Sequence, residues 1–130
     1  MRNFPPNENP IVVKTFSFAV NAARYCQLLQ KNRDFPLSNQ LFKSATSIGA
    51  NTREAQNAES KADFIHKFKI AAKEAAETQY WLLLCDYSKS YPACTILLEK
   101  INEISRVIGS IITSSKRKFP FSYLISLFLY

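Results

Sequence analysis

The chain has 130 residues, a length that fits one domain around a single buried core and needs no second domain. Two glycines, six prolines and 47% hydrophobic residues exclude a disordered chain and argue against an all-β fold, which needs a turn about every ten residues. The formal net charge of +7 favours anionic partners such as nucleic-acid backbones or acidic lipids.

The positive charge is unevenly distributed along the chain. Residues 1–41 and residues 91–130 each contain five basic and two acidic residues, a net charge of +3. Residues 42–90 contain seven basic and six acidic residues, a net charge of +1. We therefore expect an anion-binding surface on the outer helices and the C-terminal tail rather than on the central segment.

The cysteines and the N-terminal segment predict a cytoplasmic protein. Cys26, Cys85 and Cys94 form an odd set without metal-ligand spacing, so a disulfide framework is not expected. The polar, proline-containing N-terminal segment lacks the apolar stretch of a signal peptide. Cys26 and Cys85 fall on apolar helix faces, which favours core packing over a reactive role.

The first predicted helix covers about residues 11–32. Its apolar residues recur at spacings of three and four, as they do on one face of a helix. The predicted buried positions are Val12, Phe16, Phe18 or Ala19, Ala23 and Cys26. Pro36 then breaks the helix, and Ser38 or Asn39 is predicted to cap the next one by accepting a backbone N–H bond.

The second predicted helix, about residues 39–57, has a narrow stripe of small residues. The predicted buried positions are Leu41, Ala45, Ile48, Thr52 and Ala55. A glycine inside a helix costs about 1 kcal/mol relative to alanine unless packing compensates. We therefore expect close helix packing at Ala45 and Gly49.

The third predicted helix, about residues 61–89, is the longest. Ser60 and Asp63 form a weaker version of the capping box that starts a helix. A heptad-like seam follows at Phe64, Phe68, Ala71, Ala75, Thr78, Leu82 and Cys85. A second apolar strip at Ile65, Ala72, Ala76 and Leu83 predicts that this helix packs against more than one partner.

The fourth predicted helix, about residues 93–117, has an isoleucine-rich seam. Its members are Leu97, Ile101, Ile104, Ile108 and Ile111. Four helices of roughly 20 residues joined by short loops predict an all-α fold, an antiparallel up-down-up-down four-helix bundle. Residues 1–118 would form this single domain, and residues 119–130 an apolar C-terminal tail.

Three sequence runs in the centre of the chain resemble a known family. They are SIGAN at 47–51, REAQ at 53–56 and ESKADFIHKFKIAAKEAAET at 59–78. Together they are similar to the four-helix-bundle family of 23S rRNA intervening-sequence proteins, which is related to the accessory variability determinant of diversity-generating retroelements. The chain departs from the family pattern at Ala45, at Thr52 and after Lys118.

The resemblance implies an assembly and partners. Family members are left-handed antiparallel four-helix bundles that assemble as homopentameric rings. Some retroelement relatives are basic proteins that contact RNA and a reverse transcriptase. The resemblance therefore implies a ring-shaped homo-oligomer, with RNA or DNA as a partner and a reverse transcriptase as a further one if the chain belongs to a retroelement.

Five polar residues match the family run: Asn51, Arg53, Glu54, Glu74 and Glu77. They form either a ligand or RNA site, or a hydrogen-bonded network between the second and third helices or between subunits. The network is the favoured interpretation, because charges of both signs interleaved on helices usually pair with each other.

The sequence contains no pattern that indicates catalysis, a metal site or a cofactor. Asp63 and His66 have a spacing of three, but a di-iron bundle needs a carboxylate and histidine pair from each of two helices, and the chain has one histidine. The serines of the second helix have no nearby histidine in the sequence to act as a base. Tyr80, Trp81 and Tyr87 either stack on bases or pack, and packing is favoured.

The C-terminal tail is apolar and follows three basic residues. Its 12 residues are too short to cross a bilayer core of ~30 Å as a helix. The tail packs on its own bundle or on a neighbouring subunit, lies on a membrane surface, or has little consequence; packing is the favoured interpretation.

Two functional hypotheses follow. The first is a non-enzymatic oligomeric interaction protein that binds nucleic acid through a basic outer surface. Its candidate phosphate contacts are Lys14, Arg24, Lys31, Arg106, Lys116, Arg117 and Lys118. The alternative is a structural scaffold that binds a protein or membrane through the small-residue helix face and the apolar tail.

Overall fold

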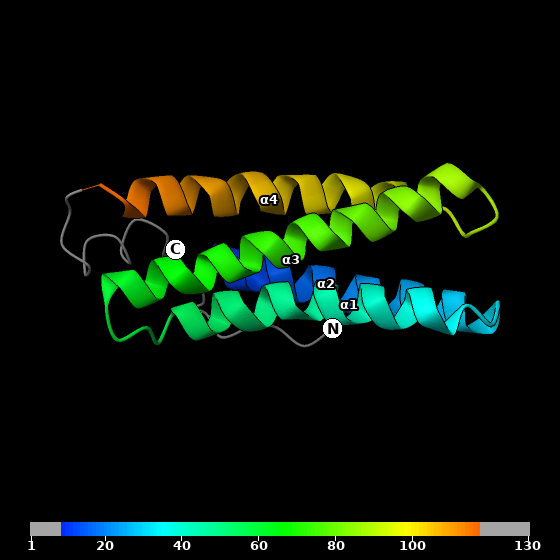
Figure 1. Cartoon of the computed structure of the whole chain (residues 1–130), viewed down its shortest axis with the longest axis horizontal. Helices are drawn as coiled ribbons and strands as arrows, with labels where there is room; N and C mark the ends of the chain where they lie inside the picture. The colour runs from blue at the N-terminus through cyan, green and yellow to red at the C-terminus, as the bar shows by residue number, and fades with distance from the viewer. Residues whose placement is uncertain (1–8, 118–130) are drawn as a thin grey trace.

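The computed structural model describes residues 9–117, which form four α-helices and no strand. The helices are α1 (Pro10–Lys31), α2 (Phe35–Ala55), α3 (Lys61–Ser88) and α4 (Thr95–Ser115). They lie side by side along the long axis of the molecule (Figure 1). None of the helices within these residues is long and apolar enough to span a membrane.

Each helix contacts the next one in sequence, and α1 also contacts α4. The Ser38 hydroxyl near the start of α2 donates to the backbone oxygen of Cys26 near the end of α1. The Tyr25 hydroxyl of α1 donates to the backbone oxygen of Pro92, just before α4. The end of α1 therefore lies beside the starts of α2 and α4.

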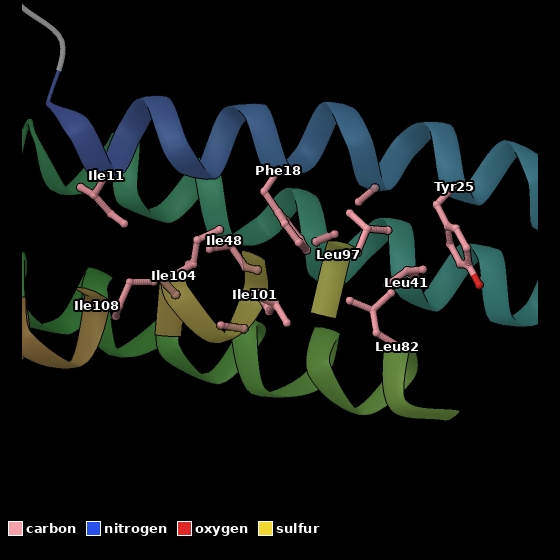
Figure 2. Close-up of a cluster of buried hydrophobic side chains, with 14 of the residues drawn as sticks. Ile11, Phe18, Tyr25, Leu41, Ile48, Leu82, Leu97, Ile101, Ile104 and Ile108 are labelled. Atoms are coloured by element: carbon pink, nitrogen blue, oxygen red, sulfur yellow. The ribbon is translucent and has the colours of Figure 1, made fainter. Parts of the chain in front are cut away.

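The core contains residues from all four helices. Figure 2 shows Ile11, Phe18 and Tyr25 of α1 pointing toward side chains of the other three helices. Along α4 every third or fourth residue is buried, because that spacing follows one face of the helix. The buried apolar residues of α4 are Leu97, Ile101, Ile104, Ile108 and Ile111, as the sequence predicts.

The start of α2 differs from the prediction. The helix begins at Phe35, where Asp34 is the N-terminal cap and its carboxylate accepts a bond from the backbone N–H of Leu37. Pro36 lies in the first turn, where a helix needs no intrahelical N–H donor, so it initiates α2 rather than preventing it. The prediction that Ser38 or Asn39 caps this helix is wrong.

The buried face of α1 also differs from the prediction. Phe16 is 46% exposed and Ala23 is only partly buried, whereas Thr15 and Ala22 are fully buried. The buried residues of α1 are Ile11, Val12, Thr15, Phe18, Ala22, Tyr25, Cys26 and Leu29. The prediction is therefore confirmed at Val12, Phe18 and Cys26 and wrong at Phe16.

The predicted cap of α3 is present. The Ser60 side chain accepts a bond of 3.0 Å from the backbone N–H of Asp63. The Asp63 carboxylate accepts a bond of 3.2 Å from the backbone N–H of Glu59. The two residues together satisfy donors at the helix start that have no partner within the helix.

Candidate functional site

The residues predicted to contact phosphate lie on α1, on α4 and just after α4. The described ones are Lys14, Arg24 and Lys31 on α1, Arg106 on α4, and Lys116 and Arg117 after it. All six are exposed. Lys118 lies outside the described residues.

These basic residues do not converge on one small site. Because Tyr25 contacts Pro92, the end of α1 with Lys31 lies near the start of α4. Lys116 and Arg117 follow the other end of α4, which has 21 residues and is therefore about 30 Å long. An anion that reaches both ends must be a polymer rather than a small molecule.

A groove with a volume of about 530 Å³ lies between α1 and α4. These two helices form the most loosely packed neighbouring pair. The apolar wall residues are Val13, Phe18 and Leu28 of α1 and Ile96, Leu97 and Ile104 of α4. Leu28 is 44% exposed and Ile96 is 71% exposed, so part of this apolar wall faces solvent. We call this feature the α1–α4 groove.

Charged side chains line the α1–α4 groove. Lys14 Nζ lies 2.5 Å from Glu103 Oε1, and Lys100 Nζ lies 3.7 Å from Glu103 Oε2. Hydrogen bonding from Lys14 and the charges of both lysines lower the pKa of the Glu103 carboxyl. Arg24 Nη1 lies 3.5 Å from the side-chain oxygen of Asn21. Three cations and one carboxylate give the groove a net charge of +2.

The five polar residues that match the family run lie at different places on α2 and α3. Asn51 donates to the backbone oxygen of Ser47 in its own helix at 2.8 Å. Glu54 accepts a bond of 2.9 Å from Lys67, which links α2 to α3. Arg53 lines a concavity between α1 and α2. The structure therefore places Glu54 at the contact between α2 and α3, and Arg53 beside residues of α1.

The other two polar family positions, Glu74 and Glu77, lie on α3. Burial and the nearby Glu77 carboxylate raise the pKa of Glu74, whereas Lys43 of α2 acts in the opposite direction. Glu74 is thus electrostatically coupled to α2 through Lys43. The ion pair of Glu54 with Lys67 joins α2 to α3, and the charge of Lys43 acts on Glu74 across the same two helices.

The small residues of α2 pack against α1 inside the subunit. Ala45 is fully buried. A Cβ atom added to Gly49 would lie 3.4 Å from the backbone oxygen of Thr15, at the limit of ordinary contact. The absence of a side chain at Gly49 allows a close approach of α1 to α2, and Gly49 itself is partly exposed.

Buried hydroxyls join the helices. The sequence predicts Thr52 and Thr78 as buried positions, which is confirmed, but it predicts neither Thr15 and Ser44 nor the bonds between them. Thr15 Oγ1 and Thr52 Oγ1 lie 2.9 Å apart between α1 and α2. Thr78 donates to Ser44 at 2.9 Å between α3 and α2. Each threonine also bonds to a backbone oxygen of its own helix, which allows a hydroxyl to be buried without an unpaired donor.

The cysteines lie in the core. Cys26, Cys85 and Cys94 are buried and free. Burial raises the pKa of all three thiols, that of Cys26 to about 11. A thiol with a raised pKa is a poor nucleophile near neutral pH, because only the thiolate reacts readily.

The outer face of α3 carries an exposed apolar stripe. Tyr80, Leu83, Leu84 and Tyr87 are 56%, 50%, 43% and 88% exposed and share a concave surface with Ala76. We call the four larger residues the α3 ridge. Tyr80 packs by stacking on Trp81, with ring centroids 5.0 Å apart, although Tyr80 and Tyr87 are both largely exposed. The second apolar strip expected on this helix exists, but Ala76 and Leu83 are exposed.

Comparison with known proteins places these features in a family. Residues 7–110 match the family model described as 23S rRNA-intervening sequence protein. The chain belongs to the 23S rRNA-intervening sequence protein family. No curated protein matched the chain.

A solved structure of the family is similar to this chain. It is a protein of unknown function from the S23 ribosomal protein family of Bacteroides thetaiotaomicron. The two are 40% identical, with a TM-score of 0.74, and the match covers 78% of this chain and 97% of that one. The shared fold is therefore supported by both sequence and structure.

The region matched by the 23S rRNA-intervening sequence protein family contains both apolar surfaces. The α1–α4 groove lies between residues 13 and 104, and the α3 ridge lies between residues 80 and 87. Lys116 and Arg117 lie beyond the match. Within residues 9–117, no group of three or more His, Cys, Asp or Glu side chains could hold a metal ion.

Proposed function

We propose that this family member is a non-enzymatic, oligomeric interaction protein of the cytoplasm that binds the backbone of RNA or DNA through α1 and α4. The observation that carries this proposal is the concentration of positive charge on α1 and directly after α4. Residues 10–31 and 95–117 contain seven basic residues and two acidic ones, a net charge of +5, whereas α4 itself, Thr95–Ser115, has a net charge of zero. Residues 42–90 have a net charge of only +1.

The spacing of the cations suits a strand of nucleic acid. The basic residues extend over about 30 Å, the length of α4. Contacts to phosphate come mainly from flexible Lys and Arg side chains, and they need no sequence-specific pocket. The proposed ligand is therefore recognised by its charge and length rather than by its bases.

The proposal includes an up-down-up-down antiparallel bundle that assembles into a ring, a homopentamer as the family resemblance implies. The contact of Ser38 with Cys26 and that of Thr15 with Thr52 support the antiparallel order of α1 and α2. The buried free thiols support a cytoplasmic location, because reduced cysteines persist there.

A salt titration with a fluorescent single-stranded RNA tests the proposal. A Lys31→Gln/Arg106→Gln variant removes two exposed cations from α1 and α4, and a Lys69→Gln/Lys73→Gln variant removes two from α3. We expect the first variant to bind more weakly and to lower the slope of log K against log salt by about 1 per lost contact. The second should bind like the unmodified protein.

The control separates a local surface from net charge, because both variants lose the same total charge. Equal loss of binding in both variants would show that α1 and α4 have no special role. If the unmodified protein does not bind RNA or DNA at low salt, where release of counterions favours binding most, the nucleic-acid part of the proposal is wrong.

A further inference from the structure

The α1–α4 groove has the composition of a site for a small amphiphilic molecule. Its volume of about 530 Å³ lies within the range of about 300–1,000 Å³ that is usual for small-molecule sites. Phe18 of α1 and Leu97 and Ile104 of α4 give it an apolar interior. In such sites a few polar groups fix the orientation of the ligand. The groove therefore suits a ligand that is apolar along most of its length.

Arg24 gives the groove a cation that has no acidic partner within residues 9–117. Its guanidinium donates to the side-chain oxygen of Asn21 at 3.5 Å, whereas Lys14 and Lys100 both pair with Glu103. A guanidinium presents its N–H donors as a planar fork, which binds both oxygens of a carboxylate at once. The excess positive charge of the groove is thus suited to a ligand with a carboxylate.

We propose that the α1–α4 groove binds a long-chain fatty acid, with the carboxylate at Arg24 and the alkyl chain along the apolar walls. The inference goes beyond the proposed function, because it assigns a small ligand to the apolar interior of the groove. A nucleic-acid backbone contacts exposed cations and needs no such interior.

The two ends of the groove give the alkyl chain a direction. Ser17, Asn21 and Arg24 are spaced by four and three residues, so they follow one face of α1. From Arg24 back to Val13 this wall rises by about 16 Å, at about 1.5 Å per residue. Beside Val13, the ion pair of Lys14 with Glu103 joins α1 to α4. A chain that starts at Arg24 therefore runs along the groove toward this ion pair.

Exposed apolar side chains beside Arg24 provide a reason for binding. Leu28, one turn further along α1, is 44% exposed, and Ile96 on the opposite wall is 71% exposed. Each methylene that leaves water on binding strengthens the affinity by up to about fourfold. Affinity should thus rise with the length of the alkyl chain until the groove is filled, and a neutral ligand of equal length would gain nothing from Arg24.

The test measures the binding of cis-parinarate, a fluorescent long-chain fatty acid, to the delipidated full chain. Ser17→Phe places an aromatic ring on the partly buried groove wall, and its matched control is Ser110→Phe on the exposed surface of α4. Arg24→Gln removes the proposed carboxylate partner, and its matched control is Lys73→Gln on the exposed surface of α3. Circular dichroism monitors the helical content of each variant, and light scattering its mass.

We expect saturable binding to the unmodified protein and to both controls. Ser17→Phe should abolish binding, because the ring occupies the path of the alkyl chain. Arg24→Gln should weaken binding about tenfold, the lower end of the contribution of a hydrogen bond to a charged group, because this side chain is exposed.

Competing ligands separate the two parts of the proposed contact. Laurate should displace the probe better than the shorter caprate, by up to about fourfold for each added methylene. Methyl laurate, which has the same alkyl chain but no charge, should displace it equally well from the unmodified protein and from Arg24→Gln. Laurate should lose affinity in that variant.

Several results would overturn the inference. Unchanged binding by Ser17→Phe places the site elsewhere, and equal displacement by laurate and by the cationic dodecyltrimethylammonium excludes a role for the charge. Should Ser17→Phe lose its helical signal, Arg24→Gln decides, and unchanged affinity for laurate in that variant contradicts the inference.

Another occupant of the groove would also be detected. If the full chain does not bind the probe but a chain ending at Arg117 does, the C-terminal tail occupies the groove. If the probe binds only after dilution to the subunit mass of 14.9 kDa, a second copy occupies it. Either result, or no binding under any condition, overturns the fatty-acid site, whereas the salt titration with RNA tests the proposed function separately.

Discussion

The Cys26 thiol illustrates how a single buried residue couples stability to pH. Its side chain is 3% exposed, and burial raises its pKa from 9.0 to about 11. In the unfolded chain the thiol would lose its proton near its ordinary pKa. Between these two values the unfolded state binds fewer protons than the folded state, so stability falls as pH rises. Below the ordinary value the full contribution is retained.

A Cys26→Ala variant should therefore lose less stability at high pH than the unmodified protein does. Between about pH 7 and about pH 10.5, the unmodified protein should lose roughly 1–2 kcal/mol more of its unfolding free energy than the variant loses. Urea unfolding at both pH values measures it. Parallel losses in the two proteins would show that Cys26 does not carry the effect and that other groups do.

Thr15 shows where residue-level prediction failed. The periodicity of α1 is visible in the sequence, but the predicted stripe includes Phe16 and passes over Thr15, although threonines are predicted as buried at Thr52 and Thr78. In the structure Thr15 is fully buried and bonds to the backbone oxygen of Ile11 and to Thr52, while Phe16 is 46% exposed. A hydroxyl that bonds within its own helix behaves as a small core residue. The bond to a second helix depends on the tertiary structure, which the local sequence does not show.

At the scale of elements, the contact between α1 and α2 depends on the absence of a side chain at Gly49. Gly49 and Gly109 both lie inside helices, so alanine should favour the helix at either position by up to about 1 kcal/mol. An added Cβ at Gly109 meets no atom within 4 Å, whereas one at Gly49 would touch the Thr15 backbone. Longer side chains at Gly49 must push the two helices apart.

We expect Gly109→Ala to raise the free energy of unfolding by about 0.5–1 kcal/mol and Gly49→Leu to lower it by about 1–3 kcal/mol through overpacking. Gly109→Leu is the matched control and should be nearly neutral or mildly stabilising, because the position is exposed. Denaturant unfolding of the three variants measures the changes. A Gly49→Leu protein as stable as the control would mean that the crossing is loose.

The start of α2 shows why element boundaries were harder to predict than elements. The apolar periodicity that identified each helix is strong in its interior and uninformative at its ends. Pro36 was interpreted as a break, although a proline is equally suited to a first helical turn. Asp34 decides between these alternatives, because its carboxylate caps the helix. Arg33, with a φ of 61°, then turns the chain between α1 and α2.

At the scale of the whole molecule, the sequence predicted the distribution of charge better than the location of surfaces. A count of charges needs no coordinates, so the nearly neutral centre and the basic outer segments follow from the sequence alone. The α1–α4 groove could not be predicted in this way, because it arises from the loose packing of two helices distant in sequence. Of the α3 ridge, only Leu83 belongs to the second apolar strip that the sequence predicts, and the structure shows that the large residues of the ridge face outward.

Removal of residues 118–130 is the prediction that concerns the molecule as a whole. The described buried apolar core extends from Ile11 to Ile111, so a chain ending at Arg117 should keep its helical signal. The groove and the ridge also lie before this point. We therefore expect the truncated protein to keep both its unfolding midpoint and its oligomeric mass. Circular dichroism and light scattering measure these properties.

The outcome of this truncation distinguishes the roles left open for the apolar tail. Loss of mass with an unchanged helical signal would make the tail an assembly element. Loss of the helical signal would make it part of the fold. Retention of both properties would leave assembly to the helices, because all four of them end before Arg117.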